Sequence, residues 1–536
     1  MSDSASTRTK TLTDTDDTQS TDNSLIADRW TNNITYRQLV ISSCIGIVQL
    51  WWHPYVHDLT KLVPFIFLYN VFSIFIGYPM FYLELALGVV TKKGVLKCWD
   101  LSPMARGIGY AMLLCCVFTA LALGVVNAWC LAMLVHSFHS FLPWQHCAAT
   151  ARPACAARHR PLPHGSETPP QSFFFNFVLN LKREGLEGGL GIVVWELTFY
   201  YVISWILIYF ITVKRIYSYS KLVLFKDVLT YFMLLSFLLG APRLNGAGRM
   251  FSLCDWSRLQ NGLQIWREAI EFSLIEMTVS QGVLVMLGVY CPKQQHRLAT
   301  TSLLAFAASK STCMCSAFLL GAVHGALQHD YDNTTNIWGG SSSAMVLWSD
   351  YVVRIPGSQF WSALLFFTMF VVSLSSTALI VQTIMSSFTG RSIRKITWAF
   401  LILNCSLFCI IGSITLCTQG GLYVLNFLME WPILKPRLLI SATVAIVVTY
   451  VYGQTTFCED VYFAVGEYPS AFLRVCWALS PVLLVGLFLG DICAWPSAES
   501  MVGWLMVVIT ALPVVVIMLV YIIFKCRVRN MVRNEK

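Results

Sequence analysis

The sequence predicts an all-α polytopic membrane protein with 12 transmembrane helices. Of its 536 residues, 56% are apolar and only 12% are charged, about half the charged fraction of a typical soluble domain, which is roughly 25%. The apolar residues are gathered in long runs separated by short polar loops. This composition excludes a set of soluble domains, a disordered chain and a small disulfide-rich scaffold.

Twelve apolar runs have the length of a membrane span, and helices are expected because an unpaired backbone group in lipid is costly. Three runs are longer than one span needs, which indicates tilted or bent helices. The first run is the weakest, because only Leu39 to Trp52 is strongly apolar. In chain order the predicted spans are 37–56, 63–89, 108–137, 190–212, 222–241, 264–290, 298–324, 359–388, 397–417, 421–452, 474–494 and 503–524.

The distribution of lysine and arginine predicts the orientation in the membrane. These residues cluster after spans two, four and eight and at the C-terminal end, all on the side of both termini, which is therefore expected to be cytosolic. Residues 1–29 are polar, lack the apolar stretch of a signal peptide and are expected to be a disordered cytosolic tail. Residues 525–536 are expected to be a basic cytosolic tail. The basic clusters account for the net charge of +9, so no nucleic-acid partner is needed to explain that charge. We expect a multi-pass protein of the plasma membrane.

The opposite side carries a long loop, 138–189, which is expected to be extracellular. It contains Cys147 and Cys155, and an oxidising exterior favours a disulfide between them, with two free thiols as the alternative. Another outer segment contains an Asn-x-Thr sequence at Asn333, which is expected to be a glycosylation site.

Several stretches together resemble the neurotransmitter:sodium symporter family. Span two reads Gly77-Tyr78-Pro79-Met80-Phe81-Tyr82-Leu83-Glu84-Leu85-Ala86-Leu87-Gly88, close to a signature of that family, and Leu142-Pro143-Trp144-x-x-Cys147 and Gly420-Gly421-Leu422-Tyr423 follow in the expected order. The similarity covers nearly the whole chain apart from the tails, so 30–524 would be a twelve-helix transporter domain. The resemblance implies two inverted repeats of five helices followed by helices 11 and 12, with spans one and six broken at mid-membrane.

Span one departs from the family pattern. About four residues, including flexible glycines, are missing between Gly46 and Pro54, and this loss should deform or close the substrate site. Gln49 lies where the family has a sodium-binding asparagine, so an amide oxygen is retained there on a longer side chain. Trp52 lies where the family has the arginine of its outer gate, and Leu123 in span three replaces a substrate-facing tyrosine.

Two ionisable residues are predicted to lie deep in the membrane, Glu276 in span six and Lys310 in span seven. A charge at that depth costs about 2.5–3.5 kcal/mol, so each should have a partner or a role. Glu276 could supply a fixed negative charge in place of chloride, ligate sodium beside Gln49 or carry a proton. The alternative is that Glu276 and Lys310 form a buried structural pair.

The resemblance assigns further candidate residues. Ser376 and Thr377 in span eight, with carbonyl groups near Gly46 and Val48, are candidate sodium ligands, and helix packing is the alternative role of the two hydroxyl groups. The others are Tyr82 and Ser309 as remnants of a chloride site, Glu84 as a mainly structural buried charge, Leu123, Met277 and Thr278 as substrate-pocket residues, and Arg29, Trp30, Trp52 and Tyr290 as gate residues.

Two functions are consistent with this sequence. The first is sodium-coupled transport of a small organic solute, an amino acid or a derivative, with altered chloride dependence. The second is a family member that no longer transports and acts as a binding or trafficking partner. A membrane enzyme is disfavoured, because the spans contain no constellation of nucleophile, base or metal ligands. The expected partners are the bilayer and a small solute, and a homo-oligomer is left open. Sodium is the expected ion. Chloride is not expected, because residues of the family's chloride site are replaced.

Overall fold

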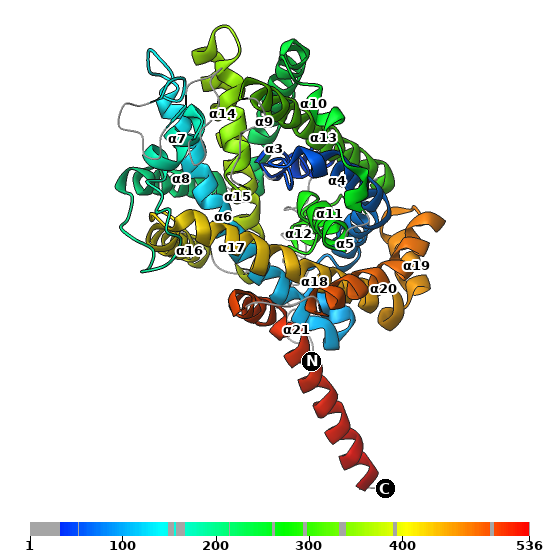
Figure 1. The fold of residues 1–536 in the computed structure, drawn as a ribbon. Helices are drawn as coiled ribbons and strands as arrows, with labels where there is room; N and C mark the ends of the chain where they lie inside the picture. The colour runs from blue at the N-terminus through cyan, green and yellow to red at the C-terminus, as the bar shows by residue number, and fades with distance from the viewer. Residues whose placement is uncertain are drawn as a thin grey trace, which may run out of the picture.

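A computed structural model of the protein describes residues 33–51, 53–147, 155–156, 167–213, 215–259, 263–292, 297–331, 339–389, 394–493 and 498–534. Almost all of the regular structure in these residues is helical, and the only extended pairings are two isolated bridges, Cys155 with Glu167 and Val193 with Thr418. Figure 1 shows the helices gathered into one bundle, from which the C-terminal end of the chain extends. The prediction of an all-α membrane protein is confirmed.

Ten helices in the described residues are long and apolar enough to cross a membrane. They match predicted spans two to five and seven to twelve, and two of them contain short π-helical segments. Two of the ten are composite: α4 (Leu59–Phe72), η1 (Ser73–Gly77) and α5 (Tyr78–Thr91) form the first, and α17 (Gly421–Leu428), η7 (Met429–Leu434), α18 (Lys435–Ile446), η8 (Val447–Gly453) and α19 (Gln454–Val465) form the second. The other eight are α6 (Arg106–His136), α8 (Trp195–Val213), α9 (Arg215–Gly240), α13 (Leu298–Asp330), α15 (Ser358–Thr389), α16 (Arg394–Thr415), α20 (Ala471–Cys493) and α21 (Ala498–Asn534).

Predicted spans one and six are broken helices. Span one consists of α2 (Asn33–Ser43), four non-helical residues and α3 (Val48–Trp51), and span six consists of α11 (Gln264–Glu276), six non-helical residues and α12 (Val283–Val289). In the second break Thr278, Ser280 and Gly282 have positive φ angles of 55°, 63° and 72°, a conformation that side chains with a Cβ adopt rarely. We call these two segments, 44–47 and 277–282, the first and the second break. Each lies in the opening helix of a five-span half, as the resemblance implies.

The bundle is built around the buried helices α6 and α15, which pack along each other. Helix α12 approaches α5 very closely, since a Cβ on Gly88 would lie 2.1 Å from the carbonyl oxygen of Val285. Helices α16 and α21 instead expose many of their large apolar side chains, as helices that face lipid do. The closely packed helices fix the positions of both breaks.

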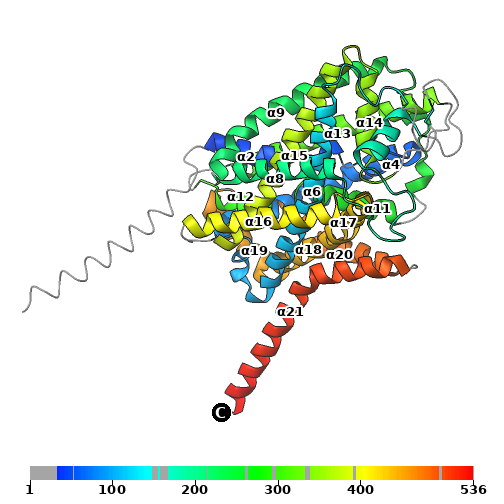
Figure 2. The same cartoon turned by 90° about the vertical axis from the view of Figure 1, so that its left-hand side faces the viewer.

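The C-terminal helix α21 extends from the bundle in both views (Figures 1 and 2). It is 37 residues long and runs to Asn534, through the predicted boundary between the twelve-helix domain and the tail at 525. Lysine and arginine favour helix nearly as well as leucine does, so the basic sequence continues the helix. The division into tails and domain stays a prediction.

The predicted outer loops contain short helices, α7 (Pro169–Ser172), η4 (Phe173–Val178) and α14 (Ser343–Val353). Cys147 and Cys155 form a disulfide with their Cα atoms 5.6 Å apart, which confirms that prediction. Four of the predicted residues lie outside the described part of the chain: Arg29, Trp30, Trp52 and Asn333.

Candidate functional site

The two breaks face one buried cavity of about 30 Å³, which has room for a few water molecules but not for an amino acid. Five transmembrane segments contribute to its wall: both broken spans, α6, α9 and α15. Seven predicted site residues line it together: Gly46, Val48, Gln49, Leu123, Glu276, Thr278 and Ser376. The sequence therefore predicted seven of the sixteen residues that line this cavity.

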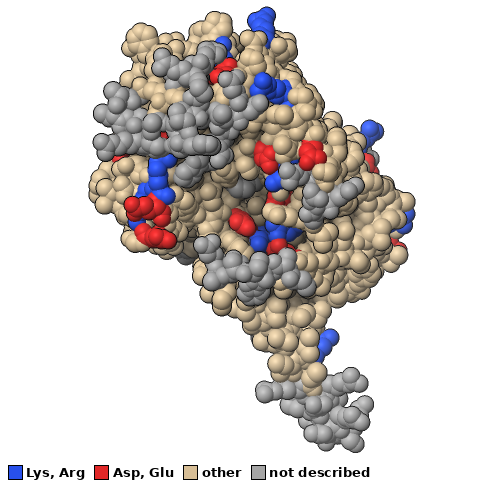
Figure 3. Space-filling model, in the orientation of Figure 1, with Lys and Arg blue, Asp and Glu red and all other residues tan. Residues whose placement is uncertain are grey.

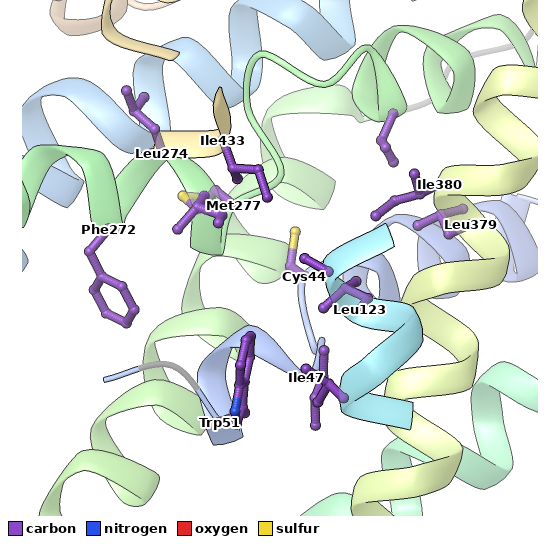
Figure 4. Close-up of a cluster of buried hydrophobic side chains, with 14 of the residues drawn as sticks. Cys44, Ile47, Trp51, Leu123, Phe272, Leu274, Met277, Leu379, Ile380 and Ile433 are labelled. Carbon is purple, nitrogen blue, oxygen red and sulfur yellow. The ribbon is translucent and has the colours of Figure 1, made fainter. Parts of the chain in front are cut away.

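One side of the cavity is apolar. Figure 4 shows Leu123 of α6 and Leu379 and Ile380 of α15 in one buried cluster with Cys44 and Ile47 of the first break. The predicted pocket residue Met277 is also buried, but its sulfur lies against Gly77 in η1 and it does not line the cavity.

Thr278 supplies an unsatisfied polar group to the same cavity. Within the described residues, its buried hydroxyl has no hydrogen-bond partner. Its φ angle of 55° is a strained conformation for a β-branched residue, and such strain is found most often at functional sites. Thr278 therefore combines a buried hydroxyl group without a partner in the described residues with a strained backbone at the wall of the cavity.

Glu276 and Lys310 form a buried ion pair, which was one of the alternatives predicted from the sequence. The carboxylate oxygen Oε2 of Glu276 lies 2.7 Å from Nζ of Lys310 and also accepts a hydrogen bond from Tyr69, while Oε1 accepts one from Ser309. Lys310 donates further to Ser73 at 2.6 Å. Both carboxylate oxygens are therefore bonded to side chains of the protein itself.

Tyr69 and Ser73, which bond Glu276 and Lys310, were not predicted as site residues from the sequence. They lie four residues apart on span two, so they share one helix face, and that spacing was the available signal. The predicted chloride-site tyrosine, Tyr82, lies elsewhere: its ring packs against Trp477, with the centroids 6.1 Å apart. The tyrosine beside Ser309 and Glu276 is Tyr69, so the geometry does not support the prediction for Tyr82.

Gln49 lies between the two breaks, but its amide is turned differently from the expectation. Its Oε1 accepts the backbone N–H of Gly46 at 2.9 Å. Its Nε2 donates to the carbonyl groups of Cys44 and Glu276 at 2.8 and 3.0 Å, and lies 3.3 Å from Oγ of Ser309. The backbone N–H of Gly46 can donate only to an oxygen, so the end of the Gln49 side chain that faces Gly46 is the amide oxygen and the other end is the nitrogen. One of the two lone pairs of this oxygen is therefore already used within the first break.

The two span-eight hydroxyl groups point to different partners. Ser376 lies at the first break, where its Oγ accepts the N–H of Ile47 at 3.2 Å. Thr377 instead accepts a hydrogen bond of 3.1 Å from Asn127 of α6 and does not line the cavity. Only Ser376 is positioned as the prediction required.

The second break is held by buried groups of two other spans. Oε1 of Glu84 accepts the N–H of Ser280 at 2.8 Å, and Nη1 of Arg437 donates to the carbonyl of Val279 at 2.7 Å. Non-helical backbone at this depth needs such protein partners. The interpretation of Glu84 as a structural residue has this contact in its favour. Tyr290, the one predicted gate residue in the described part, follows the last turn of α12.

On the predicted outer side, a second cavity of about 520 Å³ lies above α11, within the usual range for ligand pockets. We call it the vestibule. Figure 3 shows charged side chains gathered in a hollow over the region of α4 and α11 on an otherwise mostly uncharged face. Arg267 is bonded there to Asp491 of α20, and Lys435 lies 3.2 Å from the same carboxylate. The lining residues include His53, Tyr55, His57, Lys61, Arg267, Glu268, Glu271, Phe272, Asn426 and Glu430.

Comparison with known sequences identifies the family. The sequence model described as "Sodium:neurotransmitter symporter family" matches residues 27–528. The chain belongs to this family. Members of the family are transporters, and the resemblance seen in the motifs is confirmed over nearly the whole chain.

Curated symporters of this family show about a quarter identity. The chain is 24% identical to sodium- and chloride-dependent glycine transporter 2 of Xenopus laevis, over 89% of this chain and 67% of the relative. It is 26% identical to sodium- and chloride-dependent creatine transporter 1 of Bos taurus, over 87% and 77%. It is 24% identical to sodium-dependent nutrient amino acid transporter 1 of Drosophila grimshawi, over 90% and 81%.

Sodium is the ion that the symporter family implies, and the oxygen atoms at the first break do not fit it in this structure. Gln49 presents its nitrogen to the carbonyl groups of Cys44 and Glu276. The carbonyl groups of Ser42 and Ile45 accept hydrogen bonds from Lys226. A sodium ion bound to these oxygen atoms would lie beside the Lys226 ammonium group and the Gln49 N–H groups, which carry positive charge or partial positive charge and repel it.

Proposed function

We propose that the protein is a secondary transporter that carries a small organic solute, an amino acid or a derivative, across the plasma membrane, with both termini in the cytosol. The observation that supports this best is the meeting of the two breaks at one buried cavity, with the unpartnered hydroxyl of Thr278 in its wall. Broken helices that meet at mid-membrane are how transporters of this architecture hold a solute.

The composition of the cavity supports a small solute with both polar and apolar parts. Thr278 and the break backbone supply polar contacts, and Leu123, Leu379 and Ile380 supply an apolar wall. The relatives are named for transport of glycine, creatine and nutrient amino acids, which are all solutes of this kind.

Transport requires the cavity to change size. The central cavity is about 30 Å³, whereas the vestibule is about 520 Å³. The protein is therefore in a closed conformation at its centre, and a solute enters only when the broken helices move apart. We propose that the vestibule is the outer access route and that access alternates between the two sides.

We propose further that transport does not require chloride. The carboxylate of Glu276 is bonded to Tyr69, Ser309 and Lys310, so a fixed negative charge belongs to the protein where the resemblance implies a chloride ion. The Glu276–Lys310 pair is neutral as a whole and leaves no uncompensated positive charge for chloride to balance.

A binding or trafficking partner without transport activity is the second candidate. The closed cavity favours it, because a cavity of about 30 Å³ holds no amino acid unless the helices move. Transport is the better supported function, because the family match and the two broken helices around one cavity both favour it.

The test is uptake of a labelled amino-acid mixture by cells that display the protein on their surface, measured in sodium chloride, in choline chloride and in sodium gluconate. Uptake above that of control cells supports transport, and the salts report which ions it uses. No uptake with surface display established supports the non-transporting partner.

Thr278→Val tests the assignment of the solute contact. It removes the hydroxyl group but keeps the branched shape of the side chain. Loss of one polar contact of about 1.5 kcal/mol corresponds to about a tenfold change, so we expect uptake to fall by about tenfold or more. Thr212→Val is the matched control, since that hydroxyl only donates to the carbonyl of Ile208 within α8. Equal uptake by both variants would contradict the assignment.

A further inference from the structure

Lys226 of α9 is a buried cation at the first break. Its side chain is 1% exposed, and its Nζ donates to the carbonyl groups of Ser42 and Ile45, each at 2.7 Å. The carboxylate of Asp227 is 3.3 Å away. An ammonium group has three N–H donors, so these three oxygen atoms match its full bonding capacity.

The two carbonyl groups lie where the regular hydrogen bonding of α2 ends, and the oxygen of Ser42 also accepts the backbone N–H of Ile45 at 3.0 Å. Ser42 is in the last turn of α2 and Ile45 is in the break that follows. The last carbonyl groups of a helix have no partner within the helix and carry the negative end of its dipole. In transporters with broken helices, such oxygen atoms hold the coupling cation.

We infer that the ammonium group of Lys226 is a tethered cation that takes the place of a sodium ion at the first break. This deepens the proposed function by naming the charge at its ion site. The contacts that carry it, Lys226 with Ser42, Ile45 and Asp227, do not depend on which solute is carried.

The charge balance of the region supports the inference. Lys226 is paired with Asp227, and Lys310 is paired with Glu276, so two cations and two carboxylates around the breaks sum to zero. Asp227 is also fixed by a 2.8 Å hydrogen bond from the hydroxyl of Ser42. A buried region that is already neutral gains nothing from a further monovalent cation, which would have to be desolvated to enter.

The neighbouring oxygen atoms are occupied in the same way. Nε2 of Gln49 donates hydrogen bonds to the carbonyl groups of Cys44 and Glu276. The carbonyl groups bonded by Lys226 and those bonded by Gln49 therefore all accept hydrogen bonds from side-chain nitrogen atoms. Gln49 supplies no charge, whereas Lys226 does. Lys226 is therefore the residue whose removal should open a site for an external cation.

The decisive variant is Lys226→Met, which keeps the length of the side chain but removes the ammonium group. It leaves two carbonyl groups, the Asp227 carboxylate and the Ser376 hydroxyl around a space without a cation. The readouts are the thermal unfolding midpoint of the full-length purified protein in sodium chloride and in choline chloride of equal ionic strength, and binding of radioactive sodium. Neither requires a known solute.

We expect Lys226→Met to bind one more sodium ion than the unmodified protein and to unfold several degrees higher in sodium than in choline. The unmodified protein and Lys93→Met, which removes a lysine exposed far from the site, should show no such gain. The same sodium response in all three proteins, with Lys226→Met folded, would overturn the inference.

A second measurement applies if Lys226→Met does not fold in either salt. A density map of the unmodified protein in sodium chloride should show the Lys226 side chain on the carbonyl groups of Ser42 and Ile45. An ion in that position, with Lys226 turned away, would overturn the inference. Absence of solute uptake would argue against the proposed function only, because neither sodium measurement involves transport.

Discussion

Glu276 is fully buried, and its carboxylate receives hydrogen bonds from Tyr69, Ser309 and Lys310. A charge in a protein interior is tolerated when it is paired and its remaining lone pairs are bonded. Tyr69 and Ser309 complete the bonding that Lys310 alone would leave unfinished. Both carboxylate oxygens are therefore bonded within the protein, and in the proposed function the residue is an anion built into the protein.

Replacing this anion should restore a need for a mobile one. In Glu276→Ser, the ammonium group of Lys310 and the hydroxyl groups of Tyr69 and Ser309 remain without a negative partner, which is a suitable environment for chloride. We expect uptake by the variant to depend on chloride, whereas uptake by the unmodified protein persists when gluconate replaces chloride. Uptake by the unmodified protein that already stops without chloride would contradict this account.

Seven of the candidate residues line one cavity, but the hydrogen-bond partners of their side chains could not be predicted from the sequence. Gly46, Gln49, Glu276 and Ser376 meet at one cavity because the order of motifs fixes which spans face each other. The turning of the Gln49 amide onto Gly46 depends on local backbone geometry, and no sequence pattern specifies it. Lys226 was overlooked although an ionisable residue inside a predicted span is itself a signal, the same one that drew attention to Lys310.

Among the helices, ten of the long apolar runs form helices long enough to cross a membrane, whereas predicted spans one and six are each broken into two helices. The two breaks were predicted from the resemblance and not from composition. The first break, 44–47, is as apolar as the helices around it, but the second, 277–282, contains Thr278, Ser280 and Gln281 just before the apolar helix α12. Their stability comes from side chains of other spans, such as Glu84 and Arg437. These contacts join residues more than 150 positions apart in the chain, which is why reading along the sequence could not supply them.

Helix α4 begins with an N-terminal cap that can be tested by itself. Oδ1 of Asp58 accepts the N–H and the hydroxyl of Thr60 at 3.1 and 2.6 Å. Asp58→Ala should lower the unfolding free energy by about 1 kcal/mol, seen as a lower thermal midpoint in detergent. Asp58→Asn is the matched control, because an asparagine oxygen accepts the same bonds and should lose much less. Equal losses in both variants would rule out the cap as the cause.

The same cap has a definite pH dependence. Burial raises the pKa of Asp58, but the hydrogen bonds from Thr60 and the neighbouring Lys61 outweigh it and hold the pKa below the ordinary value of 3.8. A carboxylate with a lowered pKa in the folded protein stabilises it above the unfolded pKa, and this contribution is lost as the pH falls through the folded pKa. The difference between the unmodified protein and Asp58→Asn should therefore shrink only in strong acid.

For the molecule as a whole, the outer ends of the helices are joined by charges around the vestibule. Asp491 at the end of α20 binds Arg267 of α11 and Lys435 of α18, so one carboxylate connects three helices. The side chains of all three residues are at least 85% buried, with exposed fractions of 11%, 6% and 13% for Arg267, Lys435 and Asp491. Opening the vestibule further would require these contacts to change.

Asp491→Asn should destabilise the whole bundle. It removes the carboxylate that the two cations share, but Arg267 keeps Glu268 and Glu271 at 3.5 Å and Lys435 keeps Glu430 at 3.8 Å. We therefore expect a loss of about 2 kcal/mol, the contribution of a hydrogen bond to a charged group. Asp100→Asn is the control, because Asp100 bonds Lys93 and Arg106 on an exposed surface, where such pairs contribute about 1 kcal/mol or less. Thermal midpoints in detergent compare the two, and equal shifts would show that the vestibule charges do not hold the helices together.

The position of Lys226 has an electrical consequence for a transport cycle. A sodium ion that enters on one side and leaves on the other gains about 2.3 kcal/mol for each 100 mV of membrane potential, enough for a concentration ratio of roughly fiftyfold. An ammonium group on a lysine side chain cannot leave, so it returns with the empty carrier and gains nothing over a complete cycle. A protein built in this way would draw little of its driving force from voltage at this position, and its solute would accumulate less steeply or exchange with a second solute.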